Sequence, residues 1–526
     1  MANNEEIIDS KFSWRNNSLF INETFSDYKE ESMKKELSLG KSIRERLFLR
    51  KRMQHKLRKD TPKSPTNNIG KYLSISKELY DKCKDFEVNT NQIKEILSCL
   101  KSDNLEEKYT GLISIRKLLC NDKPPVEIIF ENNILPEIIS FLDGSYSVEF
   151  IYEALWCLIN ISYGNEHESE KIKNQGGIEK IIDLLNNNMD DIKEMAIWCL
   201  DNISHDSLEI KNFLAKKKII KALITMLSIN NNEKIISHIV SVIKILIELY
   251  SEKKKMNFDV KKLINTISKL IINHEYNQEN RCVKYIFYDC CHILSYLTEK
   301  SNKFNSILLE NGVIQNIIEL LKNPYIEKEV HLFHLLLKII GNIICGDANQ
   351  TSQVLNNDIF SILKKHINNE NTKIQKEVCW IISNIAADTQ ENLIRLYDNG
   401  FFPLLLKFIG SSNKSIRIEV VYALCNFTLL SDENYLGNLI VNGLLKAICD
   451  CIKEEEPKET MVCLEGLFNL LLFGDKYRSN GRNLIIEEIE KMGMIDILEK
   501  LQYHREERIY EKSLLIIETF FQYDYL

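Results

Sequence analysis

The stretch YEALWCLINISYG at residues 152–164 returns in altered form as KEMAIWCLDNISHD at residues 193–206. A Trp and an Asn four residues apart recur in it after 42 residues, as Trp156 with Asn160 and then Trp198 with Asn202. Side chains four residues apart lie on the same face of a helix, and a helical repeat places that face beside its copy. The pattern therefore predicts a ladder of indole rings and carboxamides, which is suited to binding an extended peptide rather than to catalysis.

The asparagine series continues through the second half of the chain. Asn342, Asn384 and Asn426 are 42 residues apart, and Asn469 follows after 43. A period of about 40–47 residues is typical of armadillo and related helical repeats, which bury their apolar faces against one another. A second series is expected to mark the break between one repeat and the next, with Gly just beyond a helix end. Its members are QGGI at 175–178, NGVI at 311–314, NGFF at 399–402 and NGLL at 442–445.

The composition favours a helical solenoid over a fold rich in turns. The chain of 526 residues contains only 18 Gly and 8 Pro, and its Leu- and Ile-rich windows have helical spacing. A solenoid has no single core to saturate, so a chain of this length can form one body. We therefore predict a nearly all-α fold.

Neither membrane insertion nor a disulfide framework is expected. The longest apolar run, at 239–250, is interrupted by Lys244 and Glu248 and falls short of the roughly 18 residues that span a bilayer. The first ten residues are acidic, unlike those of a signal peptide. The 14 cysteines are scattered without CxxC spacing, which indicates a reducing compartment, cytosol or nucleus.

Charge divides the chain into an arm and a body. Residues 1–60 carry 14 bases and 10 acids (net +4), and the whole chain has a net charge of −7, so the remainder has −11. We assign 1–60 to a flexible N-terminal arm, 61–90 to a linker and 91–526 to the repeats. Within the arm, residues 41–59 form a basic block with one acid and nine bases. These bases are Lys41, Arg44, Arg46, Arg50, Lys51, Arg52, Lys56, Arg58 and Lys59.

Composition alone leaves two interpretations of this basic block. It is either a solvated or nucleic-acid-binding tail, or a partner-binding helix that can fold back onto the acidic body.

Several blocks, taken in order, resemble the importin-α family of nuclear import adaptors. RKLLCNDKPPVEIIFENNILPEIISFL at 116–142 is similar to the first armadillo repeat of that family, including its double proline. The blocks around Trp156 and Trp198 are similar to its second and third repeats, NTKIQKEVCWIISNIAAD at 371–388 to its seventh, and IYEKSLLIIETFF at 509–521 to its tenth. The resemblance implies a right-handed superhelical solenoid of about ten armadillo repeats, preceded by the basic arm.

The resemblance also implies two grooves for the basic localisation signals of cargo proteins. In the major groove, Asp206 would anchor a key lysine of the signal, whose stem lies between indole rings with a cation–π contribution of ~0.5–2 kcal/mol per contact. The major-groove residues implied are Trp156, Asn160, Gly164, Ser169, Trp198, Asn202 and Asp206. The minor-groove residues implied are Asn342, Thr351, Glu377, Trp380, Asn384, Glu419, Tyr422 and Asn426.

The arm resembles an importin-β-binding segment, and LRKRM at 49–53 resembles the cluster that occupies the groove when cargo is absent. The implied partners are cargo proteins, an importin-β carrier and a nuclear export receptor for recycling, with shuttling between cytoplasm and nucleus through nuclear pores. We expect no cofactor, no membrane insertion and no direct contact with nucleic acid.

The sequence departs from the family pattern in four repeats. In repeat four, the Trp and Asn positions fall on Lys244 and Glu248, so we expect a missing ring and a cation that repels a basic ligand. The other departures are His292 followed by Tyr296 in repeat five, Ala348 beside Asp347 at the acid of repeat six, and Tyr422 for Trp in repeat eight. A narrower or shifted signal preference is the resulting hypothesis.

Enzyme signatures are absent from the sequence. Gly40-Lys41-Ser42 is not a P-loop, because Lys35 stands five residues before the Gly. There is no nucleophile elbow and no GxGxxG, and His331 with His334 lacks partners at metal-ligand spacing. We predict a protein that is not an enzyme. The alternatives kept beside the adaptor are an armadillo scaffold without a transport role and direct binding of nucleic acid through the arm.

Overall fold

The computed structural model describes residues 92–120, 124–163, 166–250, 256–453, 456–479 and 481–521. The predicted arm, its basic block at 41–59, the linker and Gly164 lie outside these residues.

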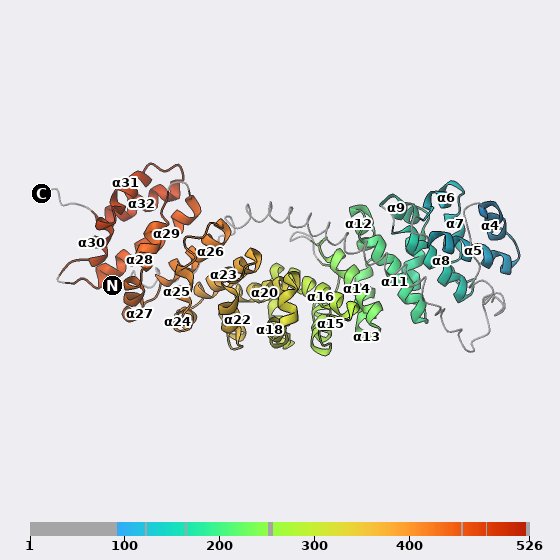
Figure 1. Cartoon of the computed structure of the whole chain (residues 1–526), viewed down its shortest axis with the longest axis horizontal. Coiled ribbons are helices and arrows are strands. Elements are labelled where there is room, and N and C mark those ends of the chain that lie inside the picture. Colours follow the sequence, from blue (N-terminus) through green and yellow to red (C-terminus); the bar gives the residue numbers. More distant parts are fainter. Residues whose placement is uncertain are drawn as a thin grey trace. The chain divides into compact units, whose positions relative to one another are not determined.

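The described helices fall into ten successive groups, each ending in a long helix that we call its third helix; the described parts of the first and fifth groups contain no first helix. The successive groups can be followed along the chain in Figure 1. The first helices are α6 (Val126–Glu131), α9 (Glu166–Asn174), α12 (Leu208–Lys216), α17 (Asn302–Glu310), α21 (Ala348–Leu355), α24 (Gln390–Asp398), α27 (Glu433–Val441) and α30 (Leu484–Lys491). The second helices are α4 (Ile93–Leu100), α7 (Leu135–Ser140), α10 (Gly177–Leu184), α13 (Ile219–Ile229), α15 (Val260–Asn273), α18 (Val313–Lys322), α22 (Ile359–His366), α25 (Phe401–Leu406), α28 (Leu444–Asp450) and α31 (Met494–Leu501). The third helices are α5 (Leu105–Leu119), α8 (Val148–Ile161), α11 (Asp190–Ser204), α14 (Glu233–Ile247), α16 (Arg281–Lys300), α20 (Val330–Ile344), α23 (Thr372–Ala386), α26 (Lys414–Phe427), α29 (Pro457–Lys476) and α32 (Glu507–Phe520). A short helix, α19 (Pro324–Lys328), precedes α20.

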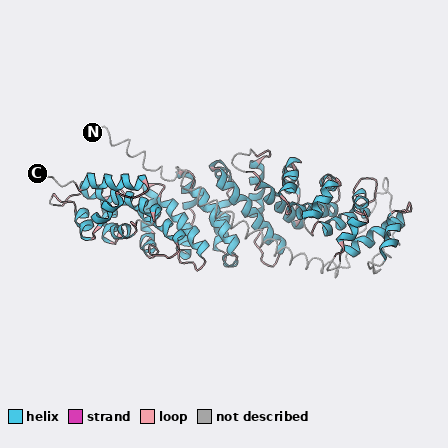
Figure 2. Ribbon diagram, turned by 90° about the horizontal axis from the view of Figure 1, so that it is seen from above, coloured by secondary structure: helices cyan, strands magenta, loops and turns pink. Residues whose placement is uncertain are grey.

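The predicted all-α fold is confirmed (Figure 2). Among the described residues the only extended pairing is an isolated bridge between Ser479 and Arg482. No helix in this part of the chain is long and apolar enough to cross a membrane.

Asparagine starts several third helices. The Oδ1 atoms of Asn232, Asn371 and Asn413 each accept a hydrogen bond from the backbone N–H two residues ahead, at the first turns of α14, α23 and α26. These bonds satisfy N–H groups that have no partner within the helix. Because this cap recurs, α14, α23 and α26 begin at comparable places in their repeats.

The described chain divides into two compact units. One contains the residues up to Thr266 together with Tyr276–Ile293, and the other contains Ile267–Glu275 and the residues from Leu294 onward. In the first unit α5, α8, α11 and α14 pack in series, and in the second α20, α23, α26, α29 and α32 do so. The buried side chains are mainly Ile and Leu on both flanks of these helices.

The glycine series has a different place from the one predicted. Gly176, Gly312, Gly400 and Gly443 lie between the first and second helices of one repeat, not between repeats. Each has a φ between 70 and 105°, a left-handed conformation that Gly adopts without steric cost. Lys218 takes the same place between α12 and α13 with a φ of 58°. The chain therefore makes this break even where glycine is lacking.

The third helices also carry buried cysteines. Cys157, Cys199 and Cys379 have no exposed surface, and each is adjacent to a Trp in the sequence. Cys425 is 7% exposed. These cysteines beside the Trp and Asn positions are therefore small core residues. Burial raises the pKa of the Cys157 thiol and raises that of Cys199 to about 12.

Replacing Lys218 by Gly should stabilise the protein. The left-handed conformation costs a residue with a Cβ atom about 1–2 kcal/mol, which exceeds the entropy that Gly adds to the unfolded chain. We expect a gain of about 0.5–1 kcal/mol in the free energy of unfolding, measured by urea denaturation. The matched control is Lys217→Gly, because Lys217 has a φ of −72° and should lose stability. A Lys218 variant no more stable than wild type would contradict this account.

Candidate peptide-binding ladders

The aromatic positions share one register within their third helices. Trp156, Trp198, Trp380 and Tyr422 each lie eight residues after the first residue of their helix. All four side chains are partly exposed. We call the rings and asparagines of α8 and α11 the first ladder, and those of α23 and α26 the second ladder.

The ladder asparagines donate hydrogen bonds mainly to the preceding repeat. The Nδ2 atom of Asn202 lies 3.2 Å from the carbonyl oxygen of Ile159, and that of Asn426 lies 3.4 Å from the carbonyl oxygen of Ser383. Asn342 of α20, which is outside both ladders, donates likewise to the carbonyl oxygen of Ser295 at 3.1 Å. Asn160 donates to Cys120 Sγ at 3.4 Å, and Asn384 to the carbonyl oxygen of Trp380 at 2.9 Å. With Nδ2 used inside the protein, the Oδ1 atom is the group suited to accept a peptide N–H.

Two of the predicted major-groove residues meet at the end of the first ladder. The Ser169 hydroxyl, on α9, donates a hydrogen bond to Asp206 Oδ2, just beyond α11. Ser169 has no exposed surface, whereas Asp206 is partly exposed. Ser169 therefore orients the carboxylate, and Asp206 is the member of the pair that a ligand can reach.

One face of Trp156 is occupied by a residue that the sequence interpretation missed. The Arg116 guanidinium, on α5, lies 4.7 Å from the centre of the indole and donates to Glu153 Oε2 at 2.8 Å. Burial by itself would lower the pKa of Arg116, but the Glu153 carboxylate outweighs burial and raises it. The available signal was the opposite charge of two residues 37 positions apart, close to one repeat length.

Trp198 is likewise stacked, on the imidazole of His238 from α14, with ring centroids 5.8 Å apart and planes at 15°. His238 Nδ1 lies 2.8 Å from Asp201 Oδ2, and the Ser241 hydroxyl donates to Asp201 Oδ1 at 2.7 Å. His205 Nε2 lies 3.3 Å from the same Oδ1 atom. Burial by itself would raise the pKa of Asp201, but the hydrogen bonds and charges of His205 and His238 outweigh it and hold this pKa well below its usual range.

Repeat four differs from the sequence expectation in register. Because α14 begins at Glu233, the position eight residues on is Ser241, and the asparagine position is Ile245. Lys244 lies between them and forms an ion pair with Asp289 on α16. The expected repulsive cation is therefore wrong, since the buried carboxylate of Asp289 neutralises it.

Glu248 and His292, the other altered positions of repeats four and five, lie together. His292 Nε2 is 3.7 Å from Glu248 Oε1, and Glu248 is exposed just beyond α14. An acid just beyond α14 and an imidazole of α16 thus lie side by side.

The second ladder rests on a glycine. Trp380 lies against Gly341 of α20, where an added Cβ atom would come within 2.1 Å of the indole Cζ3 atom. Glu377 Oε2 is 3.3 Å from His334 Nε2, and Glu419 Oε2 accepts a hydrogen bond from the Ser383 hydroxyl at 3.0 Å. Of the predicted minor-groove residues, Trp380, Asn384, Glu419 and Asn426 thus come together across α23 and α26.

Thr351 is in a different position from the other predicted minor-groove residues. It has no exposed surface, and its hydroxyl donates to the carbonyl oxygen of Ile344 at 3.1 Å. Asp347, one residue before the expected acid position at Ala348, is exposed and caps α21 by accepting a hydrogen bond from the Gln350 N–H at 2.9 Å. Thr351 therefore supports the turn, and Asp347 keeps one oxygen available.

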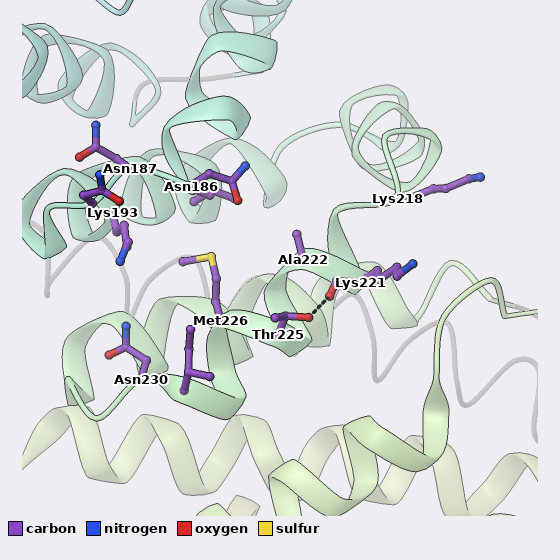
Figure 3. Close-up of a pocket in the computed structure, with 12 residues that line it drawn as sticks. Asn186, Asn187, Lys193, Lys218, Lys221, Ala222, Thr225, Met226 and Asn230 are labelled. Atoms are coloured by element: carbon purple, nitrogen blue, oxygen red, sulfur yellow. Dashed lines mark hydrogen bonds between the residues drawn. The ribbon is translucent and has the colours of Figure 1, made fainter. Parts of the chain in front are cut away.

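A pocket of about 550 Å³ lies between α13 and the turn that joins α10 to α11 (Figure 3). Its lining includes Lys193, Lys218 and Lys221 with Asn186 and Asn187, and no ring of either ladder. A pocket lined by lysines does not suit a basic peptide. The described residues contain no group of His, Cys, Asp and Glu that could hold a metal ion.

The chain is similar to several importin-α subunits over most of its length. Importin subunit alpha-1b of Oryza sativa subsp. japonica is 31% identical over 431 residues, which cover 81% of this chain and 78% of that protein. The chain belongs to the importin-α family. Importin subunit alpha-2 of Arabidopsis thaliana is 33% identical over 425 residues, 80% of this chain and 77% of the relative.

Two further comparisons agree with this importin-α assignment at the level of the fold. The family model for an atypical Arm repeat matches residues 483–525, at the predicted tenth repeat. The crystal structure of an engineered protein superposes with a TM-score of 0.60 and 15% identity, covering 82% of this chain and 98% of that one. The predicted armadillo solenoid of about ten repeats is thereby confirmed.

Replacing Gly341 by Ala should displace Trp380 and destabilise this importin-α. Helix propensity alone favours Ala by about 1 kcal/mol, but the new Cβ would overlap the indole, and overpacking typically costs about 1–3 kcal/mol. We expect a lower urea midpoint and a shifted tryptophan emission. The control is Gly410→Ala, whose Cβ meets nothing within 4 Å. A Gly341 variant with unchanged emission would show that the indole does not depend on this glycine.

Replacing Asp201 by Asn should cost about 1–3 kcal/mol at neutral pH, because charged hydrogen bonds of that size are lost. The depressed pKa means that the carboxylate stabilises the fold above the unfolded-state value of about 3.9 and loses this effect as the pH falls through the folded-state pKa. The difference between wild type and variant should therefore shrink below about pH 4 in urea titrations. Asp190→Asn, at a carboxylate 70% exposed, is the control and should change little. A difference independent of pH would contradict the prediction.

Proposed function

We propose that this protein is a nuclear import adaptor that binds basic localisation signals of cargo proteins. The observation that carries the proposal is the first ladder. It has two partly exposed indoles at the same helix position, an asparagine whose amide donates to the preceding repeat, and Asp206 oriented by Ser169. The names of its relatives, importin subunits alpha, support the same role.

The first ladder suits a lysine-rich peptide on chemical grounds. A lysine stem packs against an indole while its ammonium group gains a cation–π contact and an ion pair with Asp206. The Oδ1 atoms of Asn160 and Asn202 accept N–H groups of the peptide and hold it extended. The body has a net charge of −11, so long-range attraction raises the association rate and weakens as salt is added.

The second ladder extends the same surface chemistry to a second cluster of basic residues. Trp380 and Tyr422 offer rings, Asn384 and Asn426 offer amides, and Glu377 and Glu419 offer carboxylates. In this proposal a signal with two basic clusters engages both ladders.

The basic block at 41–59 completes the adaptor. It binds an importin-β carrier, and in the absence of the carrier its LRKRM segment at 49–53 competes with cargo for the ladders. Release of cargo in the nucleus and return to the cytoplasm on an export receptor follow from this exchange.

The test is titration of a fluorescein-labelled lysine-rich signal peptide with the full chain. Asp206→Lys should abolish binding to the first ladder, because it replaces the attractive charge with a repulsive one. The matched control is Asp183→Lys, which makes the same charge change at an exposed position of α10 and should leave affinity within about twofold.

The arm is tested in the same titration. Replacing Arg50, Lys51 and Arg52 together by Ala should tighten peptide binding and remove binding of the importin-β carrier. Failure of the wild-type chain and of the arm variant to bind the peptide would reject the adaptor function and favour a scaffold without a transport role.

A further inference from the structure

The first and second ladders share a longer motif than a Trp and an Asn. WCLDNISHD at 198–206 and WIISNIAAD at 380–388 both have Trp, Asn and Asp at intervals of four residues. Three residues spaced in this way lie along one face of a helix end. Asp388 thus stands in the second ladder where Asp206 stands in the first.

The backbone around the two aspartates is the same. Asp206 lies two residues beyond the end of α11, its N–H donates to the carbonyl oxygen of Ile203 at 3.2 Å, and Ser207 then caps α12. Asp388 lies two residues beyond α23, its N–H donates to the carbonyl oxygen of Ile385 at 3.3 Å, and Thr389 then caps α24. The two carboxylates are therefore presented from equivalent turns.

The charge of Asp388 is not balanced by a basic side chain of the described residues. Asn392 Nδ2 donates to its Oδ2 atom at 2.7 Å, and no basic side chain among the described residues forms an ion pair with it or with Asp347. Burial and the nearby negative charge of Asp347, from the preceding repeat, raise the pKa of Asp388. A bound ammonium group would offset both effects, because an opposite charge favours the ionised carboxylate.

The rest of the motif is also prepared for a ligand. Trp380 lies on the small Gly341, and among the described residues no cation covers its indole as Arg116 covers that of Trp156. Asn384, one helical turn from both Trp380 and Asp388, is 4% exposed, and its Oδ1 atom has no hydrogen-bond partner in the described structure. A buried acceptor without a partner is costly, so a turn of the Asn384 side chain that brings this oxygen to a peptide N–H would gain a hydrogen bond.

We propose that Trp380, Asn384 and Asp388 form a second lysine slot, in which Asp388 accepts the ammonium group of a peptide lysine. The inference rests on the proposed function and adds to it the residue that anchors the second basic cluster. The carboxylate that the family pattern places at Ala348 in repeat six is replaced in this chain by one from repeat seven.

The experiment titrates the full chain with the same lysine-rich peptide and counts bound peptides by calorimetry. Wild type should bind two peptides, and Asp206→Asn and Asp388→Asn should each bind one. In the Asp206→Asn background, adding Asp388→Asn should weaken the remaining site at least about tenfold, since a hydrogen bond between charged groups is lost. The matched control is Glu391→Gln, which removes an exposed negative charge three residues away and should leave both sites.

A peptide series locates the contact. Each lysine in turn is replaced by norleucine, which keeps the stem and removes the charge, and the penalty is compared between Asp206→Asn and the double variant. One lysine should lose its penalty when Asp388 is neutralised, as a direct partner does in a double-mutant cycle.

Equal affinities of the Asp388→Asn and Glu391→Gln proteins, with unchanged circular dichroism, would overturn the second slot and leave the adaptor function standing. Absence of binding to wild type would overturn both. Loss of the second site in Asp388→Asn but not in Glu391→Gln would establish the slot.

Discussion

The asparagine amide that reaches into the preceding repeat is the contact on which both ladders depend. Asn202 and Asn426 each donate to a main-chain carbonyl of the third helix before their own. Asn in mid-helix is intrinsically unfavourable, and the bond between repeats offsets this while fixing the spacing of adjacent third helices. The same bond turns the amide oxygen into the available atom. One residue type thus sets both the register of the repeats and the polarity of the surface between the rings.

The rings of the ladders differ in what lies behind them. Trp156 has a guanidinium on one face, Trp198 an imidazole, and Trp380 a glycine. A cation over an indole already uses part of the attraction that a ligand lysine would use, whereas a glycine leaves it intact. Charges beside the ladder are also paired within the protein, as in Arg116 with Glu153 and Lys244 with Asp289. The indoles of the two ladders therefore differ in how strongly they can attract a ligand cation, although the residue types match.

The recurrence of Trp and Asn was sufficient to predict the fold, because it marks the one helix of each repeat that faces its copies. It was insufficient in repeat four, where both marker residues are missing and the cap at Asn232 was the better guide to register. The glycines were predicted to lie between repeats but lie between the first and second helices of one repeat. A left-handed residue indicates that a helix ends, but it does not indicate which helix follows. Contacts between repeats, such as Arg116 with Trp156, join residues about one period apart and need the packed helices to be recognised. Asp388 could have been found from the sequence, because Trp, Asn and Asp recur at intervals of four residues in both ladders.

The buried cysteines of the third helices have a consequence for the chemistry of the whole repeat array. Cys157, Cys199 and Cys379 are kept as thiols, since burial raises their pKa, and it is the thiolate that oxidants and alkylating reagents attack. In a solenoid each repeat is held only by its neighbours, so local opening is a property of individual repeats. A thiol inside repeat two, three or seven becomes reactive when that repeat opens. The pattern of oxidised cysteines would therefore show which repeats open locally.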